Sequence, residues 1–188
     1  ADMSRGLGDV YKRQAMTSDA SDIVMPNKLG ACRAIKGALR DAGLATSDVG
    51  YINAHGTGTT ANDRTECAAV RDVFGADADK LMISSTKSMH GHLIGGTGAV
   101  EMLACIMAVR EGIVAPTINY EQPDPECDMD EVPNEAREAD VPVALSNAFA
   151  FGGLNAVMAV RRVGPANDGC AGRLSCRRSF RTARSTRQ

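Results

Sequence analysis

The sequence contains no tryptophan and few other aromatic residues, so its core must depend on aliphatic side chains. Aromatics make up 4% of the 188 residues, whereas 44% are hydrophobic, which is enough for one domain of ordinary size. No run approaches the roughly 20 apolar residues of a membrane span, and the start lacks a basic segment followed by an apolar stretch. We therefore expect neither secretion nor a membrane partner, and a cytoplasmic location.

The six cysteines lack the spacing of a metal site or a disulfide framework. There is no CxxC pair, and no spacing matches the cysteines with the three histidines as ligands. Cys32, Cys67 and Cys105 fall within helical patterns among apolar neighbours, where a free cysteine behaves as a small hydrophobe. We expect reduced thiols.

Charge is distributed unevenly along the chain, although the net charge is only −2. Residues 166–188 hold six arginines and one acid, Asp168, so the rest of the chain is acidic. This tail has few large apolar residues, which predicts disorder over residues 164–188. It carries one aromatic, Phe180, and no nucleic-acid motif, so no nucleic-acid partner is expected. Residues 1–14 show no clear periodicity and are interpreted as a non-native extension, which leaves a folded body at residues 15–163.

Hydrophobic periodicity within this body predicts an α/β protein with a mixed sheet and helices on both of its faces. Helices are expected over residues 26–42, 63–74 and 98–111, the first two ending at Gly43 and Gly75 and the second preceded by Asn62 as its cap. Short apolar runs at 49–54 and 81–85 predict strands, and 143–149 with 154–162 predict a hairpin. Prolines and acids at residues 121–142 indicate a surface excursion.

Three of the predicted strands are each followed by a loop rich in small, hydroxyl and imidazole side chains. The loops are residues 54–59 (AHGTGT), 85–92 (STKSMHGH) and 147–153 (NAFAFGG). Because α/β proteins usually place their chemistry at the edge where strands end, we expect these loops to meet there.

His55 and His92 are the candidate catalytic histidines of these loops. Two neutral imidazoles can each donate an N–H to one developing oxyanion. The alternative is a structural role, in which a single histidine after a strand satisfies the hydrogen bonds of the turn. Zinc held by His55, His90 and His92 is the alternative, but Lys87 would place a positive charge beside the ion and no carboxylate or cysteine completes the set. We therefore expect no metal.

Lys87 and the Phe151-Gly152-Gly153 turn complete the candidate site. Lys87 is either solvated or held beside the imidazoles, in which case Glu66 is the candidate partner, because a buried ammonium is costly when unpaired. The Gly pair fits a tight hairpin. Its amides could also face a substrate carbonyl while Phe151 opens and closes an apolar channel.

Together with residues 116–119 (PTIN) and the acidic excursion, the three motifs resemble the β-ketoacyl-(acyl-carrier-protein) synthases, the condensing enzymes of fatty-acid and polyketide synthesis. The resemblance covers about residues 15–162 and corresponds to the C-terminal part of a family member. It implies a thiolase-like fold and decarboxylative condensation of an acyl thioester with malonyl carrier protein. No cofactor is bound covalently, because the substrates are carried on the phosphopantetheine of acyl carrier protein.

The resemblance also implies roles for individual residues. His55, His92 and Lys87 would be catalytic, and the gating Phe151 would place its amide in an oxyanion hole. Asp63 and Glu66 would buttress the loops, Glu66 through Lys87. The phosphopantetheine arm and the acyl substrate would be met by Thr57, Thr59, Phe149, Phe151, Gly152 and Gly153.

Three departures from the family pattern are visible. The family nucleophile, a cysteine, belongs to an N-terminal half that this chain is expected to lack, so the fragment would be inactive alone and would need that half and, in the complete protein, a homodimer. His90 replaces a smaller hydroxyl residue, which favours a nodulation-type or polyketide-type subgroup, and Ala150 replaces a commoner glycine. The alternative function is a non-catalytic partner similar to chain-length factors. A thiolase-type enzyme fits less well, because thiolases carry a cysteine loop in place of Phe-Gly-Gly.

Overall fold

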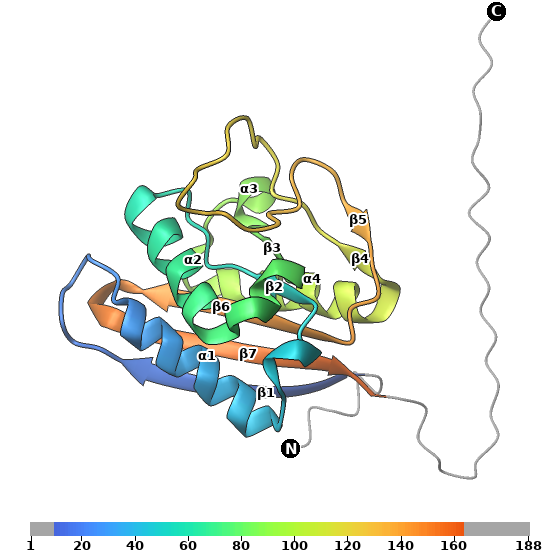
Figure 1. The fold of residues 1–188 in the computed structure, drawn as a ribbon. Coiled ribbons are helices and arrows are strands. Elements are labelled where there is room, and N and C mark those ends of the chain that lie inside the picture. The colour runs from blue at the N-terminus through green and yellow to red at the C-terminus, as the bar shows by residue number, and fades with distance from the viewer. Residues whose placement is uncertain (1–9, 164–188) are drawn as a thin grey trace, which may run out of the picture.

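The chain folds around a five-stranded mixed sheet in the order β1-β7-β6-β2-β3, as seen in a computed structural model that describes residues 10–163 (Figure 1). A two-stranded sheet, β4-β5, lies beside it. The α/β fold with a mixed sheet is confirmed. The elements are β1 (Val10–Ser18), α1 (Lys28–Ala42), β2 (Tyr51–Asn53), α2 (Thr60–Phe74), β3 (Met82–Ser84), α3 (Lys87–His90), α4 (Thr97–Glu111), β4 (Ile113–Val114), β5 (Arg137–Glu138), β6 (Val143–Ala150) and β7 (Leu154–Arg162).

Helices cover both faces of the sheet, as predicted. On one face α1 lies across β1 and β7 and packs against α2 (Figure 1). The opposite face is covered by α4, which contacts β2, β6 and β7. Each face has its own hydrophobic core, the first including Ile35, Ile52 and Leu145, and the second Val109, Val114 and Val160. The central strands are therefore buried on both sides, which explains their nearly continuous apolar runs.

The helices end at the glycines predicted from the sequence, but their first residues differ from the predicted ones. α1 begins after Asn27, whose side chain accepts the Leu29 N–H at 2.9 Å, and ends at Gly43 in the left-handed conformation. α2 starts at Thr60, before the predicted cap Asn62, so Asn62 lies within its first turn. Gly37 lets α1 approach the sheet, because a Cβ there would meet that of Ala15 at 2.8 Å.

Strand β1 corrects the predicted start of the folded body at residue 15. Val10–Ser18 pairs antiparallel with β7 along its full length, from Val10 opposite Arg162 to Ser18 opposite Leu154. Residues 10–14 thus belong to the sheet although their side chains follow no clear period, because backbone pairing at a sheet edge does not require one. The rest of the predicted extension, residues 1–9, and the predicted tail at 164–188 lie outside the described residues.

The three strands that precede the motif loops run parallel to one another. β2 lies between β3 and β6, with Asn53 opposite both Ser84 and Ser146. Their carboxyl ends, and the loops that follow, therefore meet at one edge of the sheet, as predicted. β6 continues into β7 through Phe151–Gly153 as the predicted antiparallel hairpin.

The acidic segment, residues 121–142, lies over this edge. Arg64 on α2 binds Asp124 at 3.0 Å. The segment is not wholly a surface excursion, since Val132 and Val141 are fully buried in the second core. Over residues 10–163, no helix combines the length and apolar character needed to cross a membrane.

Candidate active site

The two predicted catalytic histidines meet at the carboxyl edge of the parallel strands. The ring centroids of His55 and His92 lie 5.7 Å apart with their planes at 85°. Phe149, at the end of β6, places its ring 5.8 Å from His55. Loops separated by more than 30 residues in the sequence thus bring two imidazoles and an aromatic wall together.

Both imidazoles are suited to donate a hydrogen bond. Burial, aided by the charge of Lys87, lowers the pKa of His55 to about 3, so the ring is neutral near pH 7. The Nδ1 atom of His92 accepts the Ile94 N–H at 3.0 Å. A neutral His92 therefore carries its proton on Nε2, which leaves that atom as a donor.

Glu66 joins the loop after β2 to strand β6. Its carboxylate accepts the backbone N–H groups of His55 and Gly56, each at 2.9 Å, and the side-chain amide of Asn147 at 3.0 Å. Glu66 is 2% exposed, and burial raises its pKa. Because these donors come from the loop after β2 and from β6 itself, one carboxylate fixes the position of His55 relative to β6.

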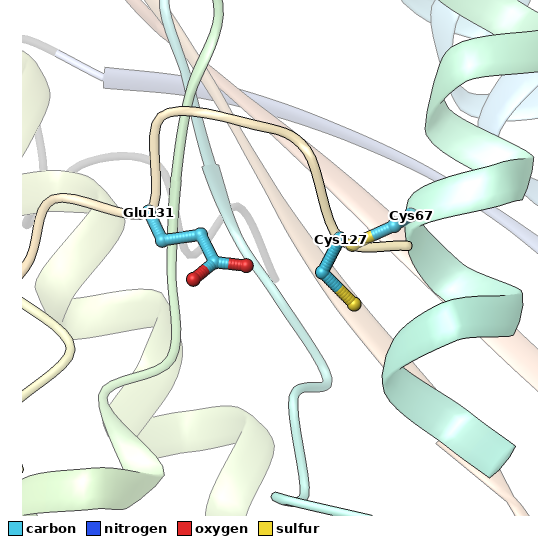
Figure 2. Close-up of side chains that lie close together, drawn as sticks. All are labelled: Cys67, Cys127 and Glu131. Atoms are coloured by element: carbon cyan, nitrogen blue, oxygen red, sulfur yellow. The ribbon is translucent and has the colours of Figure 1, made fainter. Parts of the chain in front are cut away.

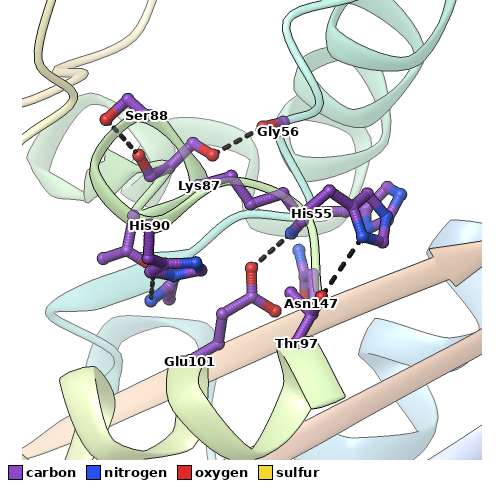
Figure 3. Close-up of polar contacts among 12 residues, drawn as sticks. His55, Gly56, Lys87, Ser88, His90, Thr97, Glu101 and Asn147 are labelled. Carbon is purple, nitrogen blue, oxygen red and sulfur yellow. Dashed lines mark hydrogen bonds and ion pairs between the residues drawn. The ribbon is translucent and has the colours of Figure 1, made fainter. Parts of the chain in front are cut away.

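Lys87 pairs with Glu101 and not, as predicted, with Glu66. Its Nζ donates to Glu101 Oε1, and the two side chains are 5% and 1% exposed (Figure 3). The prediction was wrong because Glu66 already serves three N–H groups, while Lys87, the first residue of α3, reaches across to α4. Sequence analysis missed Glu101, although a single acid within the first turns of an otherwise apolar helix was a visible signal.

A cleft of about 600 Å³ opens beside these residues. Gly56, Thr57, Lys87 and His92 line one part of it. Thr57 and Thr59 are joined through their hydroxyls at 2.9 Å, so the two predicted substrate-binding threonines lie side by side on the exposed loop. Asp63 also lines the cleft and accepts the amide of Asn62 at 3.0 Å, a bond within its own helix.

In the Phe151–Gly153 turn, one of the backbone amides predicted to face a substrate is already hydrogen-bonded within the protein. The Gly152 N–H donates to the Ile23 carbonyl at 2.9 Å, so this amide is occupied. Gly153 adopts φ 77°, and a Cβ there would meet that of Asp19 at 2.7 Å, which explains the glycine. Phe151 itself is 76% exposed, so its ring is free to change position.

His90 stands apart from the other two histidines. Its ring nitrogens contact Gly91 O at 2.7 Å and Thr86 Oγ1 at 3.1 Å. Its hydrogen bonds are therefore made within its own loop, apart from the pair formed by His55 and His92.

The carboxyl edge of the mixed sheet thus carries two imidazoles 5.7 Å apart beside a buried lysine–glutamate pair, and such imidazoles can offer N–H donors to a shared oxygen atom. The profile of the family described as "Beta-ketoacyl synthase, C-terminal domain" matches residues 10–121. The chain belongs to the β-ketoacyl synthase family and contains its C-terminal domain.

Two relatives and one solved structure illustrate the similarity. Nodulation protein E of Rhizobium sp. (strain N33) is 56% identical over 148 residues, 79% of this chain and 37% of the relative. The 3-oxoacyl-[acyl-carrier-protein] synthase 2 of a Synechocystis species is 53% identical over 79% of this chain and 36% of its own length. The ishigamide ketosynthase/chain length factor superposes with a TM-score of 0.77 at 42% identity, covering 80% of this chain and 37% of the other. The thiolase-like fold is confirmed, and the chain spans just over a third of the length of these proteins.

Proposed function

We propose that the chain supplies the C-terminal part of an enzyme that condenses an acyl thioester with malonyl-(acyl-carrier-protein), with loss of carbon dioxide. The observation that carries the proposal is the approach of His55 and His92, whose ring centroids lie 5.7 Å apart, with His92 lining the cleft. Two N–H donors at this separation suit the stabilisation of one enolate oxygen.

In this reaction the acyl chain is held as a thioester on a cysteine of the N-terminal half. The malonyl thioester loses carbon dioxide, and the electrons of the broken C–C bond form an enolate whose oxygen accepts N–H bonds from His55 and His92. The enolate carbon attacks the acyl carbonyl, the C–S bond breaks, and the cysteine thiolate recovers a proton. Lys87, paired with Glu101, holds the loop between the histidines and adds positive charge beside the enolate.

The same proposal assigns the remaining partners. Thr57 and Thr59 would meet the phosphopantetheine arm of acyl carrier protein, and the ring of Phe151 would open and close the acyl channel. Phe149, Gly152 and Gly153 would shape that channel, while Asp63 and Glu66 support the loops. The complete protein would act as a homodimer in the cytoplasm, where the free cysteines of the described part would stay reduced. The names of the relatives favour a nodulation-type subgroup.

The test uses the complete enzyme, with this chain joined to its N-terminal half. His55→Ala and His92→Ala are each expected to slow decarboxylation of malonyl-(acyl-carrier-protein) by at least about 10²-fold, because each removes one oxyanion donor. His90→Ser is the matched control, since it removes an imidazole whose bonds stay within its own loop, and its rate is expected to stay close to that of the unsubstituted enzyme. Unchanged decarboxylation in both alanine variants would show that the two imidazoles are structural.

The second candidate, a partner subunit, is favoured by the similarity to a ketosynthase/chain length factor. Transfer of a radiolabelled acyl group to the complete protein, measured before malonyl addition, separates the two. A stable thioester supports the synthase, whereas its absence supports the partner subunit.

A further inference from the structure

Three side chains of types that bind metal ions lie close together, and none of them has a role in the proposed condensation reaction. Cys67 projects from α2 toward the acidic segment, which carries Cys127 and Glu131 (Figure 2). The two Sγ atoms and a carboxylate oxygen of Glu131 lie within 4.8 Å of one another. Because the cysteines are far apart in the sequence, no motif spacing could reveal the group.

The environment of these two thiols differs from that of the other buried cysteines. Cys32 and Cys105 donate to backbone carbonyls, Ala69 O at 3.6 Å and Leu145 O at 3.4 Å, and so act as small core residues. Cys67 and Cys127 instead interact with each other through their thiols. Both are free and 7% exposed.

We propose that Cys67, Cys127 and Glu131 form a binding site for a divalent metal ion of the zinc type. Two thiolates and one carboxylate are a ligand set that zinc accepts, and softer sulfur ligands select it over magnesium or calcium. At zinc–sulfur distances of about 2.3 Å, tetrahedral geometry places two sulfurs roughly 3.8 Å apart. The observed group, with its ligand atoms all within 4.8 Å of one another, is compatible with this geometry.

The surroundings supply negative charge and access. Cys67, Cys127, Glu131, Asp63 and Asp124 all line the cleft, so an ion can enter from it and take a water molecule as its fourth ligand. Burial raises the pKa of both thiols, so without an ion they are protonated. A bound cation reverses this preference and releases the protons.

A metal at this position would fasten the acidic segment to α2. Cys67 directly follows Glu66, whose carboxylate holds the backbone of His55 and Gly56. The ion would therefore stiffen the helix turn that positions this loop. The site shares no ligand with the proposed condensation machinery, so either proposal can fail without the other.

The test is metal binding to the full chain in a Cys170→Ser, Cys176→Ser background, which removes two thiols that lie outside the described residues. Equilibrium dialysis with Zn²⁺ is expected to give one ion per chain, and Co²⁺ is expected to give the near-ultraviolet charge-transfer absorption of thiolate ligands. Cys67→Ser, Cys127→Ser and Glu131→Gln should each weaken binding by at least about tenfold, and the cysteine variants should reduce that absorption. Cys32→Ser and Glu135→Gln, a buried cysteine and an exposed glutamate elsewhere, are the matched controls and should change neither.

Three results would overturn the proposal: binding without thiolate absorption, equal affinity in Cys67→Ser, or a protein mass lower by two hydrogen atoms that marks a Cys67–Cys127 disulfide. Should the variants fail to fold, alkylation of the unsubstituted thiols gives the answer. Over an incubation long enough to alkylate Cys67 and Cys127 in the metal-free chain, zinc should protect both from iodoacetamide and leave Cys32 unaffected; equal alkylation with and without zinc under that condition would exclude the site.

Discussion

His55 combines a functional position with a cost to stability in acid. Its ring packs against His92 and Phe149, and burial keeps it neutral, with a pKa of about 3. In the unfolded chain a histidine takes up a proton near pH 6.5. Burial thus keeps the imidazole of His55 neutral, which is the form proposed to donate an N–H to the enolate oxygen.

The sign of the resulting pH dependence follows from this difference. As the pH falls below about 6.5, the unfolded chain binds a proton at His55 that the folded chain refuses, so stability present at neutral pH is lost toward pH 3. Between pH 7 and pH 5 this loss is on the order of 2 kcal/mol. Urea unfolding at both pH values should show a smaller loss for His55→Gln than for the unsubstituted chain. Equal losses would mean that the folded protein protonates His55 as readily as the unfolded chain does.

The sequence was sufficient to locate these residues but not to pair all of them. His55 and His92 lie in loops that follow predicted strands and Phe149 lies at the end of another, and parallel strands bring their carboxyl ends together, so their meeting was predictable. Lys87 was assigned to Glu66 because sequence order shows which loops meet but not which way a side chain turns. The oxygens of Glu66 accept backbone N–H groups of the loop after β2. These N–H groups are brought to Glu66 only when the loop is folded, so the sequence alone does not show that its oxygens are occupied.

At the scale of elements, the contact of Lys87 with Glu101 joins α3 to α4. Both side chains are almost fully buried, so each charge is tolerated only because of the other. Lys87→Met should lower the free energy of unfolding by about 3 to 5 kcal/mol, since it leaves the carboxylate of Glu101 buried without its partner.

A double-mutant cycle tests this dependence. Lys87→Met combined with Glu101→Leu should recover most of the lost stability in urea unfolding, because no buried charge remains. Lys87→Arg is the control that keeps the charge. Simple addition of the two single losses would show that the residues do not act as a pair.

Elements were predicted better in their interiors than at their ends. Gly43 and Gly112 end α1 and α4 in the left-handed conformation. The start of α2 was placed late, because Asn62 looks like a cap although the chain already turns at Thr59. The short helix α3 was expected as loop, since four residues carry no periodic pattern.

At the scale of the whole molecule, strand β1 extends the folded body from residue 15 back to Val10. Residues 10–14 pair with residues 158–162 of β7, and α1 packs over both strands. Sequence analysis left them out because Tyr11-Lys12-Arg13-Gln14 shows no alternation of apolar and polar residues. An edge strand gains stability from its backbone ladder and from the helix above it, neither of which is visible in that string.

Removal of residues 10–14 tests their contribution. A chain that begins at Ala15 should be at least about 2 kcal/mol less stable than one that begins at Val10, because several ladder hydrogen bonds are lost. Thermal and urea unfolding of the two chains, measured side by side, give the difference. Equal stability would return the start of the body to residue 15.

The pairing of β1 with β7 also has a consequence for the order in which the molecule forms. Among residues 10–163, β1 pairs in the sheet with β7 alone, which lies about 140 residues later in the chain. During synthesis on the ribosome, β1 cannot form this pairing until β7 has emerged. Such long-range closure makes folding slow relative to a helical protein of this size and leaves the nascent chain dependent on protection from aggregation.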